Sequence, residues 1–122
     1  MMEHKKTLSS LNDIRSHPHK SLFIHLRNVG EKSKEILETK NLKIERFIDF
    51  EILKKISFLI GVAHDFGKAT KFFQEYINEE NDIERRRLGS KKETHHAFIS
   101  SLFAYYVVKE ELLKQRIIEN EY

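Results

Sequence analysis

The chain of 122 residues contains no cysteine, one proline and four glycines. The absence of cysteine excludes thiol catalysis, disulfide bonds and thiolate metal sites, so His and carboxylate side chains are the only protein ligands left for a transition metal. Because proline and glycine are scarce and long stretches are rich in Glu, Lys, Ile and Leu, the composition favours helices over sheets. We therefore predict an all-α protein.

Long apolar runs are also absent, and the first residues do not resemble a signal peptide. These observations predict a cytoplasmic protein with no membrane partner. The length allows one domain with a single small core. A net charge of +3 is compatible with binding to nucleic acid but does not argue for it.

Apolar periodicity divides the chain into an arm and a helical domain. Residues 1–18 are polar and end at Pro18, which predicts a flexible N-terminal arm, and residues 19–122 form the helical domain. Helical spacing of apolar residues predicts four main helices, at about 20–39, 47–63, 69–78 and 94–118, with Thr94 capping the last. The charged segment at about 79–93 is predicted to be a mobile loop.

One pair of residues points to metal chemistry. His64 and Asp65 close the most apolar helix, and Gly67 suits a helix end because it accepts positive φ. Imidazole nitrogen and carboxylate oxygen are suitable ligands for Mn, Fe, Co, Ni or Zn. His25, on the inward stripe of the first helix, could be a third ligand, and His95 or His96 a fourth. Taken singly, each has a structural alternative as a hydrogen-bonded core histidine or as an Asp in a turn.

Other candidate residues have ordinary structural interpretations. The histidines near the N-terminus, His4, His17 and His19, are expected to lie in solvent. Gln74 and its aromatic neighbours Phe72, Phe73 and Tyr76 are expected to pack the short helix against the core. The basic run at 85–87 could bind phosphate or be solvated, and we slightly favour solvation.

Three segments together resemble a known family. They are HLRNV at 25–29, AHDFGKATKFFQEYI at 63–77 and HAFISS at 96–101. From Pro18 onward the chain is similar to the HD nuclease domain of the CRISPR-associated helicase-nuclease that degrades target DNA in type I systems. The resemblance implies an HD-domain helical bundle, truncated after the fourth main helix.

The resemblance also implies roles for individual residues. His64 and Asp65 look like the central metal ligands, with Asp65 bridging two ions, and His25 and His96 look like further ligands. Lys68 resembles a catalytic lysine that faces the scissile phosphate. The cofactors implied are one or two divalent ions, Mn, Ni, Co or Fe, with Mg as a further candidate. The segment after His96 matches a motif with a single histidine, so the role of His95 stays open.

The family's later His-His-Gly segment and closing Asp have no counterpart before Tyr122. We therefore expect a fragment, or a site completed by another chain, with apolar helix faces that favour self-association or partner binding. The first hypothesis is a metal-dependent nuclease that hydrolyses single-stranded DNA in antiviral CRISPR interference, together with a CRISPR helicase or interference complex. The alternatives are an HD phosphohydrolase of small nucleotides and a non-catalytic HD fragment that docks onto such a partner.

Overall fold

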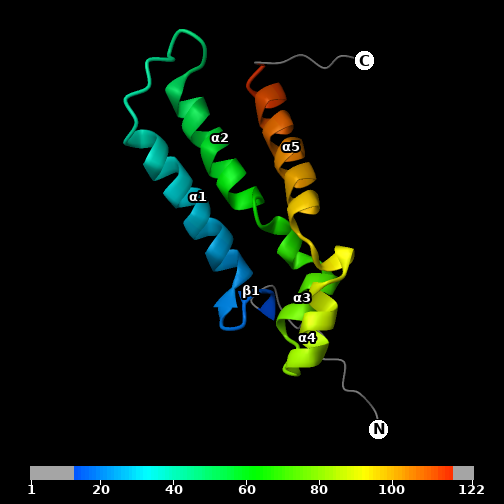
Figure 1. The fold of residues 1–122 in the computed structure, drawn as a ribbon. Coiled ribbons are helices and arrows are strands. Elements are labelled where there is room, and N and C mark those ends of the chain that lie inside the picture. The colour runs from blue at the N-terminus through cyan, green and yellow to red at the C-terminus, as the bar shows by residue number, and fades with distance from the viewer. Residues whose placement is uncertain (1–12, 117–122) are drawn as a thin grey trace, which may run out of the picture.

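A computed structural model describes residues 13–116, and within this range the protein is an all-α bundle with one short hairpin, which confirms the predicted fold class. The hairpin consists of the antiparallel strands β1 (Arg15–His17) and β2 (Lys20–Ser21). The α-helices are α1 (Leu22–Glu38), α2 (Phe50–Ala63), α3 (Lys71–Ile77), α4 (Asp82–Gly89) and α5 (Ala97–Lys114), with short 3-10 turns η2 (Phe66–Ala69) and η3 (Lys92–Thr94). Figure 1 shows α1, α2 and α5 side by side, with α3 and α4 beyond their lower ends. None of the described helices is both long and apolar enough to cross a membrane.

Two glycines allow α1 and α2 to pack closely. A Cβ atom on Gly61 would lie 2.9 Å from the Cα of Gly30, and a Cβ on Gly30 would lie 2.7 Å from a methyl of Val62. Any larger residue would force the two helices apart. Ser33 and Ser57 share a hydrogen bond of 2.8 Å across the same contact. This contact fixes the distance between α1, which carries His25, and the end of α2, which carries His64.

The turn η2 anchors the start of α5. Ser100 is buried, and its Oγ accepts a hydrogen bond of 2.8 Å from the backbone N–H of Gly67. A Cβ on Gly67 would overlap the carbonyl oxygen of His96, so this position requires glycine for close approach. The prediction that Gly67 serves through positive φ is wrong, because no glycine in the described range has positive φ. Phe66 stacks on Phe103 with ring centroids 3.8 Å apart and reinforces the contact.

The segment predicted to be a mobile loop at 79–93 contains α4 and η3, so that prediction is wrong. Asn81 caps α4 by accepting hydrogen bonds from the backbone N–H groups of Ile83 and Glu84. Acidic residues lie in the first turn and Arg86 and Arg87 in the last, which complements the helix dipole. Glu84 also pairs with Arg87. These local interactions stabilise a helix without a large apolar face.

The N-terminal arm is predicted to be flexible over residues 1–18, but residues 13–18 take part in the fold. Residues 1–12 lie outside the described range. Buried Gln74 pairs with the backbone of Arg15, accepting from its N–H at 2.9 Å and donating to its carbonyl oxygen at 2.7 Å. The second donor bond from the Gln74 amide, to the carbonyl of Lys68, is also 2.7 Å. The side chain therefore ties β1 to the turn that carries Lys68.

Two details of the predicted helices also differ. Thr94 does not cap α5, which begins at Ala97; its hydroxyl donates to the carbonyl of Leu88 at 2.6 Å. Phe73 is buried in the core as expected, whereas the side chain of Phe72 is 51% exposed. The buried apolar residues described are Leu22, Leu26, Ile56, Ala63 and Phe73.

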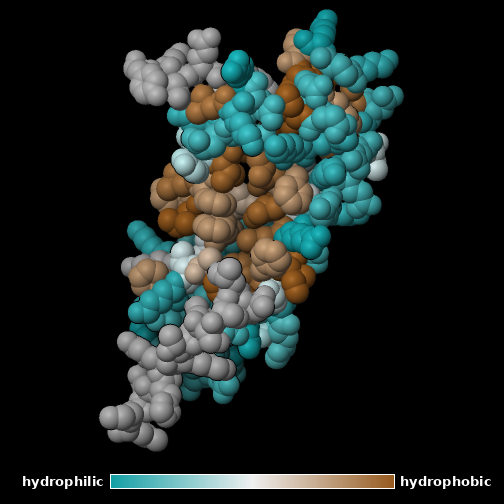
Figure 2. Space-filling view, turned by 180° about the vertical axis from the view of Figure 1, so that it is seen from behind, coloured by the Kyte–Doolittle hydropathy of each residue, from teal (hydrophilic) through white to brown (hydrophobic). Residues whose placement is uncertain are grey.

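The helix α5 leaves most of its apolar surface uncovered. Among its residues only Ser100 is buried. Large apolar side chains are exposed along it, and we call the four most exposed of them the α5 face: Phe98, Leu102, Tyr105 and Tyr106. Figure 2 shows that apolar side chains gather across the middle of one side of the molecule.

Candidate metal centre

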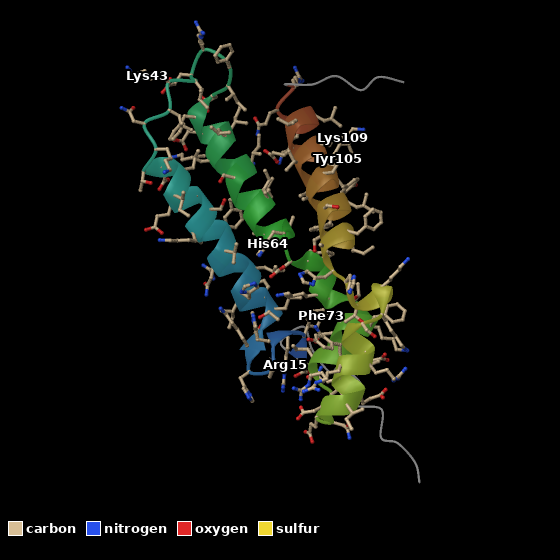
Figure 3. The ribbon with its side chains drawn as sticks, in the orientation of Figure 1. Arg15, Lys43, His64, Phe73, Tyr105 and Lys109 are labelled. Atoms are coloured by element: carbon tan, nitrogen blue, oxygen red, sulfur yellow. The ribbon has the colours of Figure 1, made fainter. Side chains whose placement is uncertain are left out.

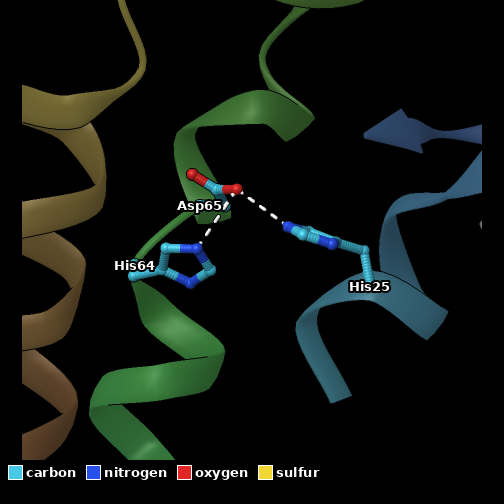
Figure 4. Close-up of side chains that lie close together, drawn as sticks. All are labelled: His25, His64 and Asp65. Atoms are coloured by element: carbon cyan, nitrogen blue, oxygen red, sulfur yellow. Dashed lines mark hydrogen bonds and ion pairs between the residues drawn. The ribbon is translucent and has the colours of Figure 1, made fainter. Parts of the chain in front are cut away.

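Four side chains lie within hydrogen-bonding or ion-pair distance of the carboxylate of Asp65. Its Oδ2 lies 2.9 Å from Nε2 of His25, 2.8 Å from Nζ of Lys68 and 3.2 Å from Nε2 of His64. Its Oδ1 lies 2.9 Å from Nε2 of His96. Figure 4 shows His25 and His64 approaching the same carboxylate from different helices.

Each of these groups is positioned by a different element. His25 lies on the first turn of α1, and His64 is the C-terminal cap of α2. Lys68 belongs to η2, and His96 precedes the first residue of α5. In Figure 3, His64 marks the end of α2, with Phe73 on α3 beyond it. The centre therefore exists only where α1, α2, η2 and α5 meet.

The orientation of His64 is set by the backbone. Its Nδ1 is 2.7 Å from the carbonyl oxygen of Gly61, and because a carbonyl can only accept, Nδ1 must donate. A neutral His64 then has its lone pair on Nε2, which faces Oδ2 of Asp65 at 3.2 Å. Two lone pairs facing each other repel, and a cation that both can ligate removes the repulsion. A carbonyl that fixes the tautomer in this way is typical of metal-binding histidines.

The charge state of Asp65 suits a ligand. Burial would raise the pKa of Asp65, but hydrogen bonds from Lys68 and His25 and the nearby His64 outweigh burial and lower this pKa to about 2. The carboxylate is therefore ionised at neutral pH although its side chain is only 12% exposed.

The donor atoms fit a metal ion. One ligand atom each from His25, His64 and Asp65 lie within 4.8 Å of one another. His96 contacts the other oxygen of the same carboxylate, so the two oxygens face different histidines, as a bridging carboxylate requires. Two nitrogens and one oxygen are a donor set suited to divalent transition metals. The side chain of His64 is 41% exposed, which leaves the group open to solvent on one side.

All of the residues predicted for the site, His25, His64, Asp65, Lys68 and His96, lie together. Lys68 is only 9% exposed, which contradicts its alternative interpretation as an ordinary surface lysine. His95 does not contact Asp65: it is exposed, and its imidazole makes no hydrogen bond, ion pair or ring contact with the described residues. Ligation and catalysis by these residues remain predictions.

Sequence reasoning missed three residues that shape the centre. His17, expected to lie in solvent, is exposed but has its ring edge-on to His25, with centroids 5.5 Å apart. Loss of hydration there, together with the charges of Lys68 and His25, lowers the pKa of His17. Ser100 and Gln74 act through the backbone, as described above. In the sequence, the turn that Pro18 indicates directly after His17 is the feature that could have predicted this position.

Comparison with models of protein families, with curated proteins and with solved structures found no match.

Proposed function

We propose that this protein is a metal-dependent phosphodiester hydrolase of the HD type, a nuclease that acts on single-stranded DNA in type I CRISPR interference. The observation that carries the proposal is the convergence of three histidines and Lys68 on the carboxylate of Asp65. A nearly buried lysine on a metal-ligand carboxylate has little value for stability alone, but it is useful where phosphate must be bound.

The chemistry divides among the residues as follows. His25, His64, Asp65 and His96 would hold one or two divalent ions, of Mn, Ni, Co or Fe, with Mg as a further candidate. Such an ion, when bound, lowers the pKa of a coordinated water and polarises a phosphoryl oxygen. Gly61 holds His64 in the ligating tautomer. Lys68 would offset the negative charge that develops on the phosphoryl oxygens.

The substrate and partners follow from the family resemblance. The segments at 25–29, 63–77 and 96–101 are those in which the chain is similar to the CRISPR HD nuclease. A CRISPR helicase or interference complex is therefore the proposed partner, and single-stranded DNA the proposed substrate.

The decisive experiment is cleavage of end-labelled single-stranded DNA by the purified protein with Mn²⁺, Ni²⁺ or EDTA. The comparison proteins are Asp65→Ala, which removes the shared carboxylate, and His19→Ala, which removes an exposed histidine outside the centre. Cleavage by the wild type and His19→Ala, lost with EDTA or in Asp65→Ala, supports the proposal. Equal activity of wild type and Asp65→Ala would refute it.

A second candidate, hydrolysis of small nucleotides, is favoured by a cavity beside Lys68 and His96 that is large enough for a small ligand. Release of phosphate from nucleotides, with no cleavage of DNA, would favour this candidate. A third, a non-catalytic fragment that docks onto a helicase, is favoured by the exposed α5 face. Normal assembly with such a partner by Asp65→Ala, with no activity in wild type, would favour the third.

A further inference from the structure

A cavity of about 560 Å³ opens beside the metal centre, between the hairpin, α3 and the start of α5. Two of its lining residues, Lys68 and His96, also contact Asp65, so whatever fills the cavity lies against the centre. The rest of the lining comes from β1, α3, the end of α4 and the η3 segment. This volume lies in the range of small-ligand sites, roughly 300–1,000 Å³.

Among the described side chains, the polar part of the lining contains no carboxylate. It offers one lysine and three histidines, Lys68, His17, His95 and His96, together with two hydroxyl residues. Lys68 and His96 are engaged by Asp65, whereas the imidazole of His95 has no partner among the described side chains. Such a lining suits an anion and disfavours a cationic or basic ligand.

The remaining wall is apolar and partly aromatic. Phe73, Tyr76 and Ile77 on α3 supply it. Tyr76 meets Phe73 edge-on, with centroids 5.7 Å apart. Gly89 packs closely against the ring of Tyr76, because a Cβ there would lie 3.0 Å from the Cε2 of Tyr76. Both Gly89 and Tyr76 line the cavity, so a larger residue at Gly89 would press on the Tyr76 ring at the cavity wall.

We propose that this cavity binds the nucleoside of one unpaired nucleotide, with Tyr76 and His95 contacting the base and the phosphate directed to Lys68. An anionic group joined to a flat apolar body is the chemistry that a basic rim and an aromatic wall together recognise. The proposal deepens the proposed function and rests on it for the position of the phosphate. It also assigns His95 to the substrate and not to the metal.

The first measurement is calorimetric binding in EDTA, so that neither hydrolysis nor metal is required. The probes are dAMP and 1,2-dideoxyribose 5-phosphate, in which a hydrogen replaces the base. We expect dAMP to bind at least about tenfold more tightly, because base stacking on an aromatic ring contributes at about that level. A second pair, a single-stranded decamer and the same decamer with one abasic position, distinguishes a nucleotide within a strand from a free one.

Two variants test the assignment, each with a matched control. Gly89→Leu places a side chain over Tyr76 at a backbone position without positive φ, and Ser90→Leu adds the same side chain one residue later, outside the cavity. We expect Gly89→Leu to abolish the preference for the base and Ser90→Leu to retain it. His95→Ala should weaken dAMP binding about threefold to tenfold, whereas His19→Ala should not.

Equal binding of the base-containing and base-free probes in both pairs would overturn the proposal. A preference for the base without any DNA cleavage leaves the cavity assigned and removes the proposed nuclease function. Metal-dependent cleavage that ignores an abasic position, together with no preference for dAMP, removes the cavity assignment and leaves the function.

Discussion

Asp65 contributes to stability through its ionised form, and this contribution has a defined pH range. The pKa of Asp65 in the folded protein, about 2, lies below the ordinary value of 3.8. A carboxyl with a depressed pKa stabilises the fold above its unfolded pKa, and the contribution is lost as the pH falls toward the folded value.

The first prediction compares the wild type with Asp65→Asn by denaturant unfolding in EDTA from pH 7 to pH 2. The difference in free energy of unfolding between them should stay constant down to about pH 4. As the pH falls further to 2, the wild type should lose about 1–2 kcal/mol of unfolding free energy relative to Asp65→Asn. A difference that changes mainly between pH 5 and 7 would point to the histidines instead.

The ammonium group of Lys68 forms an ion pair with the carboxylate oxygen of Asp65 that a metal ion would also bind. Its Nζ is 2.8 Å from Oδ2 of Asp65, the atom that His25 and His64 also approach. Because two cations near one carboxylate repel each other, the ammonium should weaken metal binding even if it assists the reaction.

The second prediction is that Lys68→Met binds Mn²⁺ about threefold to tenfold more tightly than the wild type and yet cleaves DNA at least about tenfold more slowly. Titration calorimetry and the end-label assay measure the two effects. Lys71→Met, which removes an exposed lysine on α3, is the control and should change neither. Weaker Mn²⁺ binding by Lys68→Met would show that the lysine only supports the site's structure.

Among the elements, the contact between η2 and α5 matters most to the site because it places His96 on Asp65. Among the described residues, one side-chain hydrogen bond joins the two elements: the backbone N–H of Gly67 donates to the Oγ of Ser100. Ser101, the next residue, is exposed and bonds only within its own helix.

The third prediction uses this pair of serines. Ser100→Ala leaves the buried N–H of Gly67 without an acceptor and should destabilise the protein by about 1–3 kcal/mol. Ser101→Ala should change stability by less than about 0.5 kcal/mol. Denaturant unfolding measures both, and an equal effect of the two substitutions would contradict the role given to Ser100. Ser100→Ala should also weaken metal binding, because His96 loses its anchor.

The sequence allowed the long helices to be predicted because their apolar spacing survives in the fold. The helix α4 was missed because its stability comes from Asn81, the helix dipole and a local ion pair, none of which leaves an apolar period. The start of α5 was misplaced because Thr94 bonds to Leu88, six residues before it, and not to its own helix.

At the site, the candidate ligands were predictable but the contacts that support them were not. The convergence of His25, Asp65 and His96 was expected from ordered motifs and from resemblance. The position of His17 depends on Gln74 binding Arg15 across 59 residues, a contact that no local pattern encodes. The requirement for Gly67 depends on the distance to His96, which is a tertiary property.

At the scale of the whole molecule, part of the apolar surface is exposed to solvent, because the α5 face presents four large apolar side chains. A contiguous apolar surface of this kind favours association in water. The salt bridge between Lys55 and Glu111, 2.7 Å long, holds α5 to α2 but leaves this outward surface free.

The fourth prediction is that the protein self-associates with increasing concentration in sedimentation velocity. Leu102→Glu combined with Tyr105→Glu should shift the protein toward monomer, because burying the new charges would be costly. Ile83→Glu changes an apolar residue on α4 that is more exposed than either of these two, and it is the control. A wild type that stays monomeric at all concentrations would contradict the prediction.

The residues around Asp65 leave the ribosome at widely separated times. His25 precedes the carboxylate by 40 residues and His96 follows it by 31. His25, His64 and Asp65 are therefore synthesised before His96, whose place on Asp65 depends on the docking of α5 through Ser100. Under the proposed function, an ion held before α5 docks would lack His96 as a ligand and would bind more weakly than after docking, so that firm binding would mark the completion of folding.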